Sequence, residues 1–365
     1  LNNQLKFGVI SQDITYRNPL IDLTSTSTNQ TYFVGNELIY YSKKGWKHAA
    51  NLTHRYETAT SSNYAQKKAR NISGALYQLS KFTDRYRYDF GVRTELLDSK
   101  LNPILPFISG YRQFYPFKLR NDYIRVKANA SRNFRMPSLN DLYWTPGGNP
   151  SLLPEIGYSA DLGAELRLFI SKENKKLEID QARTHNLSLV GFYSDISNWI
   201  VWMPQGSYWA PQNVKRVQNI GIETKYSFWR EFKGDANMLY FNVYYTYVHN
   251  RILESVIEND ISVGKSLLFV PAHNLRYDVE YTIRNWRFMY GHSITGKTFI
   301  DASNTSYMPY FAPAFVKISK AWGDYYYPDL KLSLKVENIF NEDYQVMPNR
   351  PMPGINFRII GEVKF

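Results

Sequence analysis

Hydrophobic and polar residues alternate with a period of two along several segments of the chain. The clearest case is 330–337, LKLSLKVE in one-letter code, where every second residue is leucine or valine. The same alternation recurs over 158–167, 220–228 and 275–282. Because successive side chains of a β-strand point to opposite faces, each segment predicts a strand with one apolar and one polar face.

The same pattern predicts roughly sixteen strands over the whole chain, with ends uncertain by about two to four residues. A tilted strand that crosses a membrane needs about 9 to 11 residues, and most of these spans are long enough. They lie near 4–16, 31–41, 46–56, 68–80, 84–95, 103–113, 121–131, 156–168, 183–195, 213–229, 237–249, 269–281, 286–297, 312–322, 329–339 and 355–365.

Short and long connections tend to alternate between these spans. The short ones include 42–45, 81–83 and 283–285, and the link 169–182 is an exception, since it is too long for a tight turn. The long ones are 17–30, 132–155, 196–212, 250–268, 298–311 and 340–354. Outer-membrane barrels keep tight turns on the periplasmic side and long loops outside, so we expect 132–155 to be an outer loop. A soluble β-sandwich, the alternative, usually has shorter spans without this rhythm.

Composition favours the same fold class. The chain has 30 Tyr, 21 Phe and 8 Trp among 365 residues, and 21% of its residues are charged. Apolar runs are too short for a membrane-spanning helix, which needs about 20 residues. Tyr and Trp are enriched where a membrane meets water. We therefore predict an all-β protein, a transmembrane antiparallel β-barrel, and keep a soluble all-β protein with an aromatic core as the alternative.

Candidate chemistry is sparse. The formal net charge of +12 favours anionic neighbours such as lipopolysaccharide or an anionic ligand, but Lys and Arg are spread along the chain, so we predict no nucleic-acid partner. There is no cysteine, and the six histidines include no close pair with zinc-ligand spacing. Phosphate-binding glycine loops and nucleophile elbows are also missing from the sequence. We predict no enzyme activity, no cofactor and no metal site.

Several motifs resemble boxes in the barrels of TonB-dependent receptors. They are ASRNFRMPSLNDLY at 130–143, GNPSLLPE at 148–155, NIGIE at 219–223, VENIFNEDY at 336–344 and PMPGINFR at 351–358, in this order along the chain. The last predicted strand ends on Phe365, as does the terminal strand that the outer-membrane assembly machinery recognises. Pro137 disfavours helical geometry at Met136, and we expect it to end a strand there.

The resemblance implies a barrel of about 22 strands with an N-terminal plug domain. This chain would then be the last part of it: residues 1–365 form a single, partial barrel domain without a plug. The plug and about six strands would lie on another chain, be removed, or not be included. A self-closing, unplugged, porin-like channel is the alternative.

The same resemblance implies TonB-dependent uptake of a scarce nutrient across the bacterial outer membrane, which this multi-pass protein would span. Segments 139–143 and 148–150 are similar to those of cobalamin transporters, so cobalamin is the first candidate. Ferric siderophores and haem are alternatives, although 138–148 lack the histidine of haem receptors. The implied partners are the TonB complex through a plug outside this chain, outer-membrane lipids and lipopolysaccharide, and the nutrient. A surface lipoprotein and a second chain completing the barrel stay open.

Two groups of candidate site residues follow. Aromatic and polar residues of the outer loops are predicted to contact the ligand, because rings stack on flat ligands; anchoring at the membrane surface is the other role for Trp199 and Trp202. These residues are Tyr143, Trp144, Asn149, Trp199, Trp202, Tyr208 and Trp209. Charged residues of the polar face are predicted to hold the plug, or otherwise to be solvated by lumen water. They are Asp161, Glu165, Arg167, Glu223, Lys225, Arg276 and Glu280.

Overall fold

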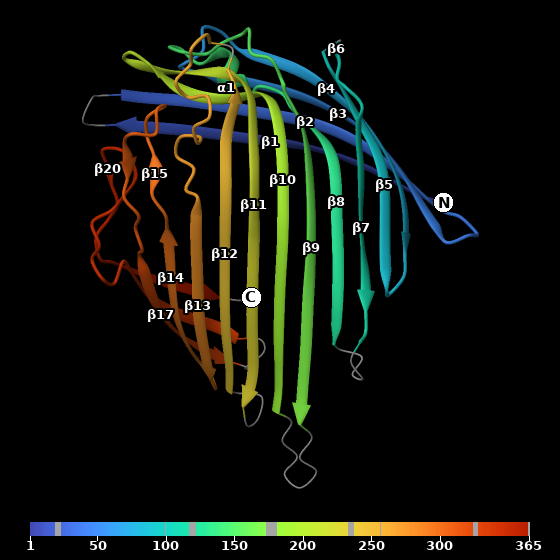
Figure 1. Cartoon of the computed structure of the whole chain (residues 1–365), viewed down its shortest axis with the longest axis vertical. Coiled ribbons are helices and arrows are strands. Elements are labelled where there is room, and N and C mark those ends of the chain that lie inside the picture. Colours follow the sequence, from blue (N-terminus) through green and yellow to red (C-terminus); the bar gives the residue numbers. More distant parts are fainter. Residues whose placement is uncertain are drawn as a thin grey trace.

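Antiparallel strands, each paired with its neighbours in the chain, make up most of the computed structural model (Figure 1). The structure describes residues 1–18, 23–98, 100–116, 122–172, 181–232, 237–255, 257–323 and 328–363. The main sheet has 17 strands, and one of them, β6 (Lys100–Leu101), has only two residues, which leaves sixteen long strands. The predicted all-β fold class and the predicted number of strands are confirmed.

Most long strands match the predicted spans, but β2 begins eight residues before the predicted start at 31. They are β1 (Asn2–Asn18), β2 (Leu23–Tyr41), β3 (Trp46–Ser61), β4 (Lys68–Phe82), β5 (Tyr86–Leu97), β7 (Leu105–Phe114), β8 (Tyr123–Arg135), β9 (Glu155–Lys172), β10 (Gln181–Gln205), β11 (Tyr208–Phe232), β12 (Asn237–Glu254), β13 (His273–Ile283), β14 (Trp286–Thr295), β17 (Ala314–Gly323), β18 (Pro328–Glu337) and β21 (Asn356–Val363). Strand β8 ends at Arg135, just before the pair Met136–Pro137, as predicted. Phe365 lies outside the described residues.

The hairpin of β10 and β11 corrects one prediction. We expected a long loop over 196–212, but pairing continues as far as Gln205 and Tyr208, so only residues 206 and 207 connect the strands. Gly206 has a φ of +63°, a conformation that glycine adopts without steric cost and that suits a two-residue turn. The prolines at 204 and 211 and the polar residues between them made this segment look like a loop, because proline is rare inside sheets.

The long loop predicted over 17–30 is a second correction, because β1 and β2 pair as far as Asn18 and Leu23. The other connections between described strands define two ends of the sheet. The turn end carries the short connections 42–45, 83–85 and 284–285. The loop end carries 62–67, 98–104, 136–154, 206–207, 255–272, 296–313 and 338–355. Within these loops lie helix α1 (Leu139–Tyr143) and two small hairpins, β15 (Thr298–Phe299) with β16 (Tyr307–Met308) and β19 (Gln345–Met347) with β20 (Arg350–Pro351). The link 169–182 is shorter than expected, since β9 extends to Lys172.

The two faces of the sheet have an unusual distribution of burial. Leu330, Leu332 and Leu334 are 43%, 48% and 45% exposed, whereas Ser333 between them is 1% exposed. Its hydroxyl donates a 2.9 Å hydrogen bond to Ser319 on the neighbouring strand. Apolar side chains therefore cover the accessible face and polar side chains the hidden one, the reverse of a water-soluble domain and typical of a barrel with a polar lumen.

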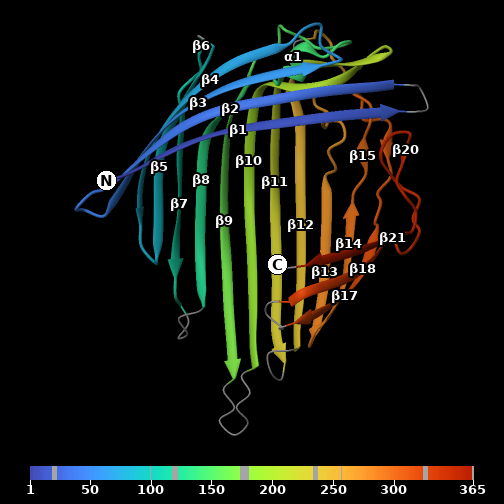
Figure 2. The same ribbon diagram turned by 180° about the vertical axis from the view of Figure 1, so that it is seen from behind.

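The sheet curves so that its two edges come to the same side of the molecule. Figure 2 shows β1 crossing in front of the upper parts of β9 to β12, and β21 crossing lower down in front of β13 and β14. Among the described residues, β1 pairs with β2 and β21 with β18, and neither has a second partner. The sheet is thus open. No helix in the described part of the chain has the length and apolar character that a membrane-crossing helix needs.

Candidate functional site: the loop end and the lumen wall

The first element of the loop end is the short helix α1, which follows the proline that ends β8. Ser138 is its N-cap: its side chain accepts a 3.1 Å hydrogen bond from the Asp141 backbone N–H, while the Asp141 carboxylate accepts a 2.8 Å bond from the Ser138 N–H. This reciprocal pair is a capping box, with aspartate in the place of the usual glutamate. It uses one oxygen of the Asp141 carboxylate and leaves the other for a contact outside the helix.

That second oxygen connects α1 to the long β10–β11 hairpin. The Trp202 indole N–H donates a 2.9 Å hydrogen bond to Asp141 Oδ1. The Asp141 backbone carbonyl also accepts a 2.8 Å bond from the Asn149 N–H. Asp141 is only 6% exposed, and its carboxylate is stabilised by the hydrogen bonds from the Trp202 indole and the Ser138 N–H. The three elements, α1, the segment after it and β10, are therefore held as one unit.

On its other side α1 contacts the connection between β3 and β4. The Tyr64 hydroxyl donates to the side chain of Asn140, and the Thr145 N–H donates a 2.8 Å bond to the Asn63 carbonyl. The Lys68 ammonium lies 4.2 Å from the centre of the Tyr143 ring. Burial, and after it the negative charge of Asp141, raises the pKa of Tyr64 above its usual value. The loop 136–154 thus contacts both β10 and the connection between β3 and β4, which are distant from each other in sequence.

Glu155, at the first residue of β9, makes a second link below α1. Its carboxylate accepts hydrogen bonds from the Arg135 guanidinium, one of them at 2.6 Å, and a 2.8 Å bond from the Ile200 backbone N–H. Glu155 is buried, and the Arg–carboxylate pair is of the strong, bidentate kind. It joins the end of β8 to the loop-end extension of β10.

The segment 147–151 packs against the tip of the same hairpin. A Cβ atom on Gly147 would lie 2.2 Å from the Trp209 carbonyl oxygen, and Gly147 has a φ of +120°. Asn149 accepts bonds of 3.0 Å and 2.6 Å from the Ser151 N–H and hydroxyl. Its side-chain amide donates a 3.5 Å bond to the Pro211 carbonyl. These contacts give Asn149 a clear role in shaping the loop.

The structure brings the seven predicted ligand residues together at the loop end, but their environments differ. Trp199 packs against the buried cluster of Val217, Ile252 and Leu267, and Trp202 binds Asp141, so both are held in packing roles. Tyr143 and Trp144 are half-buried on α1 and at its C-cap. Tyr208 and Trp209 are each 43% exposed, and the Trp209 ring lies 6.2 Å from that of Phe269. Ligand contact by these residues stays a prediction.

The seven predicted lumen residues all lie on the polar face. The strand register forms one row of paired residues across the five strands β9 to β13. In order, this row consists of Glu165, Ser188, Lys225, Tyr244 and Arg276. Asp161 and Arg167 lie on the same face of β9, Glu223 on that of β11, and Glu280 on that of β13.

Several of these charges are already paired within the wall. Glu165 contacts Arg125 at 3.2 Å and Lys127 at 2.7 Å, both on β8. Glu280 contacts Arg287 at 3.1 Å on β14. The Nε atom of Arg167 is buried and makes no hydrogen bond within the described part of the chain.

Sequence reasoning did not identify Tyr64, Lys68, Glu155, Arg125 or Lys127. Alternation over 123–135 could have placed Arg125 on the polar face, but its position opposite Glu165 follows only from the register of β8 and β9. Tyr64 and Lys68 carry no local signal, because their partners lie more than 70 residues away in the chain. Among the described residues no group of three or more His, Asp or Glu side chains could hold a metal ion.

Comparison with known proteins adds sequence relatives. A vitamin B12 transporter, BtuB, from Photobacterium profundum is 26% identical over 298 residues, which are 78% of this chain and 41% of the relative. One from Vibrio vulnificus is 30% identical over 105 residues, 28% of this chain and 15% of the relative. The chain thus spans less than half the length of these relatives.

Solved structures share the fold at low sequence identity. The copper transporter OprC superposes with a TM-score of 0.68 at 14% identity, over 100% of this chain and 62% of that protein. The ferric enterobactin receptor PfeA of Pseudomonas aeruginosa gives 0.68 at 13% identity, over 100% and 59%. The sequence profile described as "TonB dependent receptor-like, beta-barrel" matches residues 2–341. With most of its length matched by that profile, this chain belongs to the family of TonB-dependent receptor-like β-barrels.

Proposed function

We propose that this chain is the last part of the barrel of a TonB-dependent transporter, which takes up a scarce nutrient across the bacterial outer membrane. The observation that carries the proposal is the reversed distribution of burial. Apolar side chains such as Leu332 are exposed on one face of the sheet, and polar side chains such as Ser333 are hidden on the opposite face. Such a wall is stable where lipid lies outside and a polar interior inside. Family membership supplies the link to TonB.

The charged lumen face favours the proposal that a plug domain, outside this chain, fills the barrel. Charged side chains on the lumen face, among them Glu223, Lys225 and Arg276, would hold polar groups of a plug domain by hydrogen bonds and ion pairs. In this arrangement the outer loops capture the ligand, the plug blocks the lumen, and energy transmitted through TonB displaces the plug.

Cobalamin is the substrate we propose. Its support is the similarity to two BtuB transporters and the resemblance of 139–143 and 148–150 to cobalamin transporters. Ferric siderophores are the second candidate, since receptors for such ligands share the fold and a basic chain suits an anionic iron chelate. Haem uptake is a weaker alternative, because residues 138–148 contain no histidine.

Uptake by whole cells tests this proposal. The full-length protein would be produced in a bacterium that lacks its own outer-membrane cobalamin transporter, with and without TonB, and labelled cobalamin would be counted. We expect accumulation that requires TonB. Accumulation that is independent of TonB would instead indicate a porin-like channel. Rescue of growth in iron starvation by a ferric siderophore, with no cobalamin uptake, would reassign the substrate.

Ligand contact at the loop end is tested separately by binding. Tyr208 and Trp209 are the most accessible of the predicted aromatic residues. Replacing Trp209 by Ala removes a stacking surface and is expected to weaken cobalamin binding about 5- to 10-fold, as the loss of roughly 1 kcal/mol of aromatic contact implies. Trp209→Phe keeps an aromatic face and serves as the matched control. Equal affinity of both variants and the unchanged protein would remove Trp209 from the site.

A further inference from the structure

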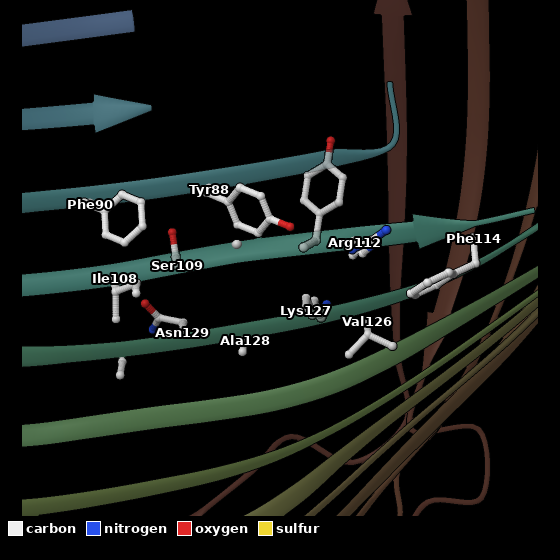
Figure 3. Close-up of a pocket in the computed structure, with 13 residues that line it drawn as sticks. Tyr88, Phe90, Ile108, Ser109, Arg112, Phe114, Val126, Lys127, Ala128 and Asn129 are labelled. Carbon is white, nitrogen blue, oxygen red and sulfur yellow. The ribbon is translucent and has the colours of Figure 1, made fainter. Parts of the chain in front are cut away.

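The outward wall of β5, β7 and β8 carries an apolar groove with a volume of about 490 Å³ (Figure 3). Its floor is made of small residues: Gly110 on β7 lies directly opposite Ala128 on β8, and Ala130 follows two residues further along. Larger side chains stand around this floor, among them Tyr88 and Val126. The groove exists because small residues on neighbouring strands share one face while their neighbours are large.

The groove lies on the face that we expect to contact lipid. Register places Tyr88 opposite Gly110 and Phe90 opposite Ile108, all on the side away from the charged lumen residues. Ile108 is 50% exposed, and the lining is predominantly apolar. An apolar recess on such a wall is filled by hydrocarbon in a membrane, since an empty one would forfeit dispersion contacts.

One cation stands at the turn end of this groove. Arg112 lies on the same outward face, opposite Tyr86 and two residues before the end of β7, and it is exposed. Its guanidinium lies 5.6 Å from the centre of the Phe114 ring. Within the described part of the chain it contacts no carboxylate, unlike Arg87 on the lumen side of β5, which is paired with Asp89 at 2.6 Å.

The length of the groove along the strands corresponds to the thickness of one membrane leaflet. Tyr86 and Tyr88 stack with their ring centres 5.2 Å apart, and stacked tyrosines at a strand end are typical of the interface between membrane and water. From Arg112 to Ile108 the strand rises by about 13 Å, at ~3.3 Å per residue. The apolar band of an outer-membrane barrel is ~25 Å tall, so the groove runs from the headgroup level to about the midplane.

We propose that this groove binds one anionic phospholipid of the periplasmic leaflet, with an acyl chain on Gly110 and Ala128 and its phosphate on Arg112. Guanidinium groups bind phosphate through two parallel N–H donors. A partner protein fits this surface poorly, because a stable interface buries about 800 Å² per partner and the recess spans only three strands. The inference rests on the proposed location of the barrel in the outer membrane.

Native mass spectrometry of the full-length protein in non-ionic detergent tests the site, with phosphatidylglycerol as the probe. We expect one lipid to stay bound. Arg112→Gln is expected to lower the affinity ~10-fold or more, the usual effect of losing a charge-assisted hydrogen bond. Ala128→Phe fills the floor and is expected to abolish retention, and Ala128→Leu serves as a milder second variant in case the first fails to fold.

Matched controls separate this site from general lipid binding. Ala50→Phe changes an outward-facing alanine on β3, opposite Leu38 and Tyr77, and Arg132→Gln removes an outward-facing cation at the loop end. Both should retain the lipid. Diacylglycerol, which lacks the phosphate, and inorganic phosphate alone should bind at least ~10-fold more weakly.

The proposal would be overturned by equal retention in the Ala128 variants, or by binding of diacylglycerol as tight as that of phosphatidylglycerol. Tight binding of free phosphate to Arg112 would reassign the residue to a phosphate site without an acyl chain and would overturn it too. A protein that folds into bilayers but binds lipids without selectivity contradicts only the groove. A protein that does not insert contradicts the proposed function as well.

Discussion

Trp202 and Asp141 are 61 residues apart in the chain, and the indole N–H of the first donates a 2.9 Å hydrogen bond to the carboxylate of the second. The bond joins the longest hairpin of the sheet to the only helix within the described residues. Because the other oxygen of Asp141 caps that helix, one buried carboxylate couples the local geometry of α1 to its place on the barrel.

Replacing Trp202 by Phe should loosen the loop 138–149 without unfolding the sheet. The change leaves one oxygen of a buried carboxylate without its donor, at a cost of ~1–3 kcal/mol. Amide hydrogen exchange in this loop is therefore expected to become about 5- to 150-fold faster. Trp209→Phe, at an exposed position of the same hairpin, is the control and should leave exchange unchanged. Unaltered protection in Trp202→Phe would show that the bond contributes nothing to loop stability.

Gly147 is expected to tolerate alanine poorly. A Cβ atom there would collide with the Trp209 carbonyl at 2.2 Å, and the φ of +120° is unfavourable for any other residue. Gly206→Ala is the matched control: its φ of +63° is also left-handed, but no atom lies within 4 Å of the new Cβ. The control should lose ~1–2 kcal/mol of local stability, and Gly147→Ala more. Proteolysis of the loop end measures both, and equal sensitivity would contradict the close packing.

Leu162 and Asp161 are neighbours on β9 that point to opposite faces, so one experiment tests the orientation of the wall. Leu162 is 64% exposed on the apolar face. Arginine there should destabilise the inserted barrel by ~2–4 kcal/mol, as found near the midplane of other barrels. Asp161→Arg, which faces the lumen, should insert nearly normally. Folding into lipid vesicles, followed by heat-modifiable mobility in gels, measures this. If Asp161→Arg were the more damaging change, the assignment of faces would be reversed.

Asp301, in the loop between β14 and β17, should stay ionised in acid. Hydrogen bonds from the Ser303 hydroxyl, the Ser306 N–H and Thr305 hold the pKa of its carboxyl far below the ordinary value of 3.8. A folded-state pKa that is lowered in this way stabilises the loop above pH 3.8 and loses that effect as the pH falls through the folded value. The carboxyl ¹³C shift, titrated by NMR, should show the low midpoint.

Ser303→Ala removes the first of these donors and is the comparison for that titration. We expect the pKa of Asp301 to move back towards 3.8 in this variant, because a hydrogen bond to the charged form favours ionisation. An ordinary midpoint in the unchanged protein, or no difference between the two proteins, would contradict the role of this turn.

The period of two in the sequence determined most of the fold. It located the sixteen long strands and put Glu165 and Arg276 on the polar face, because each strand must present one side to an apolar surrounding and the other to a polar interior. That requirement acts on neighbouring residues. It can therefore be read without knowing how the strands are arranged in space. The end of β8 was predicted separately, from Pro137.

Only the tertiary structure decided which loop residues meet. The contacts of Asp141 with Trp202, of Tyr64 with Asn140 and of Gly110 with Ala128 join separate segments, and the extension of β10 and β11 replaced a predicted loop. Such contacts depend on strand register and sheet curvature, which accumulate over many strands and leave no local trace in the sequence. Alternation predicts the face on which a side chain lies, and the curvature and register of the sheet determine which residues it contacts.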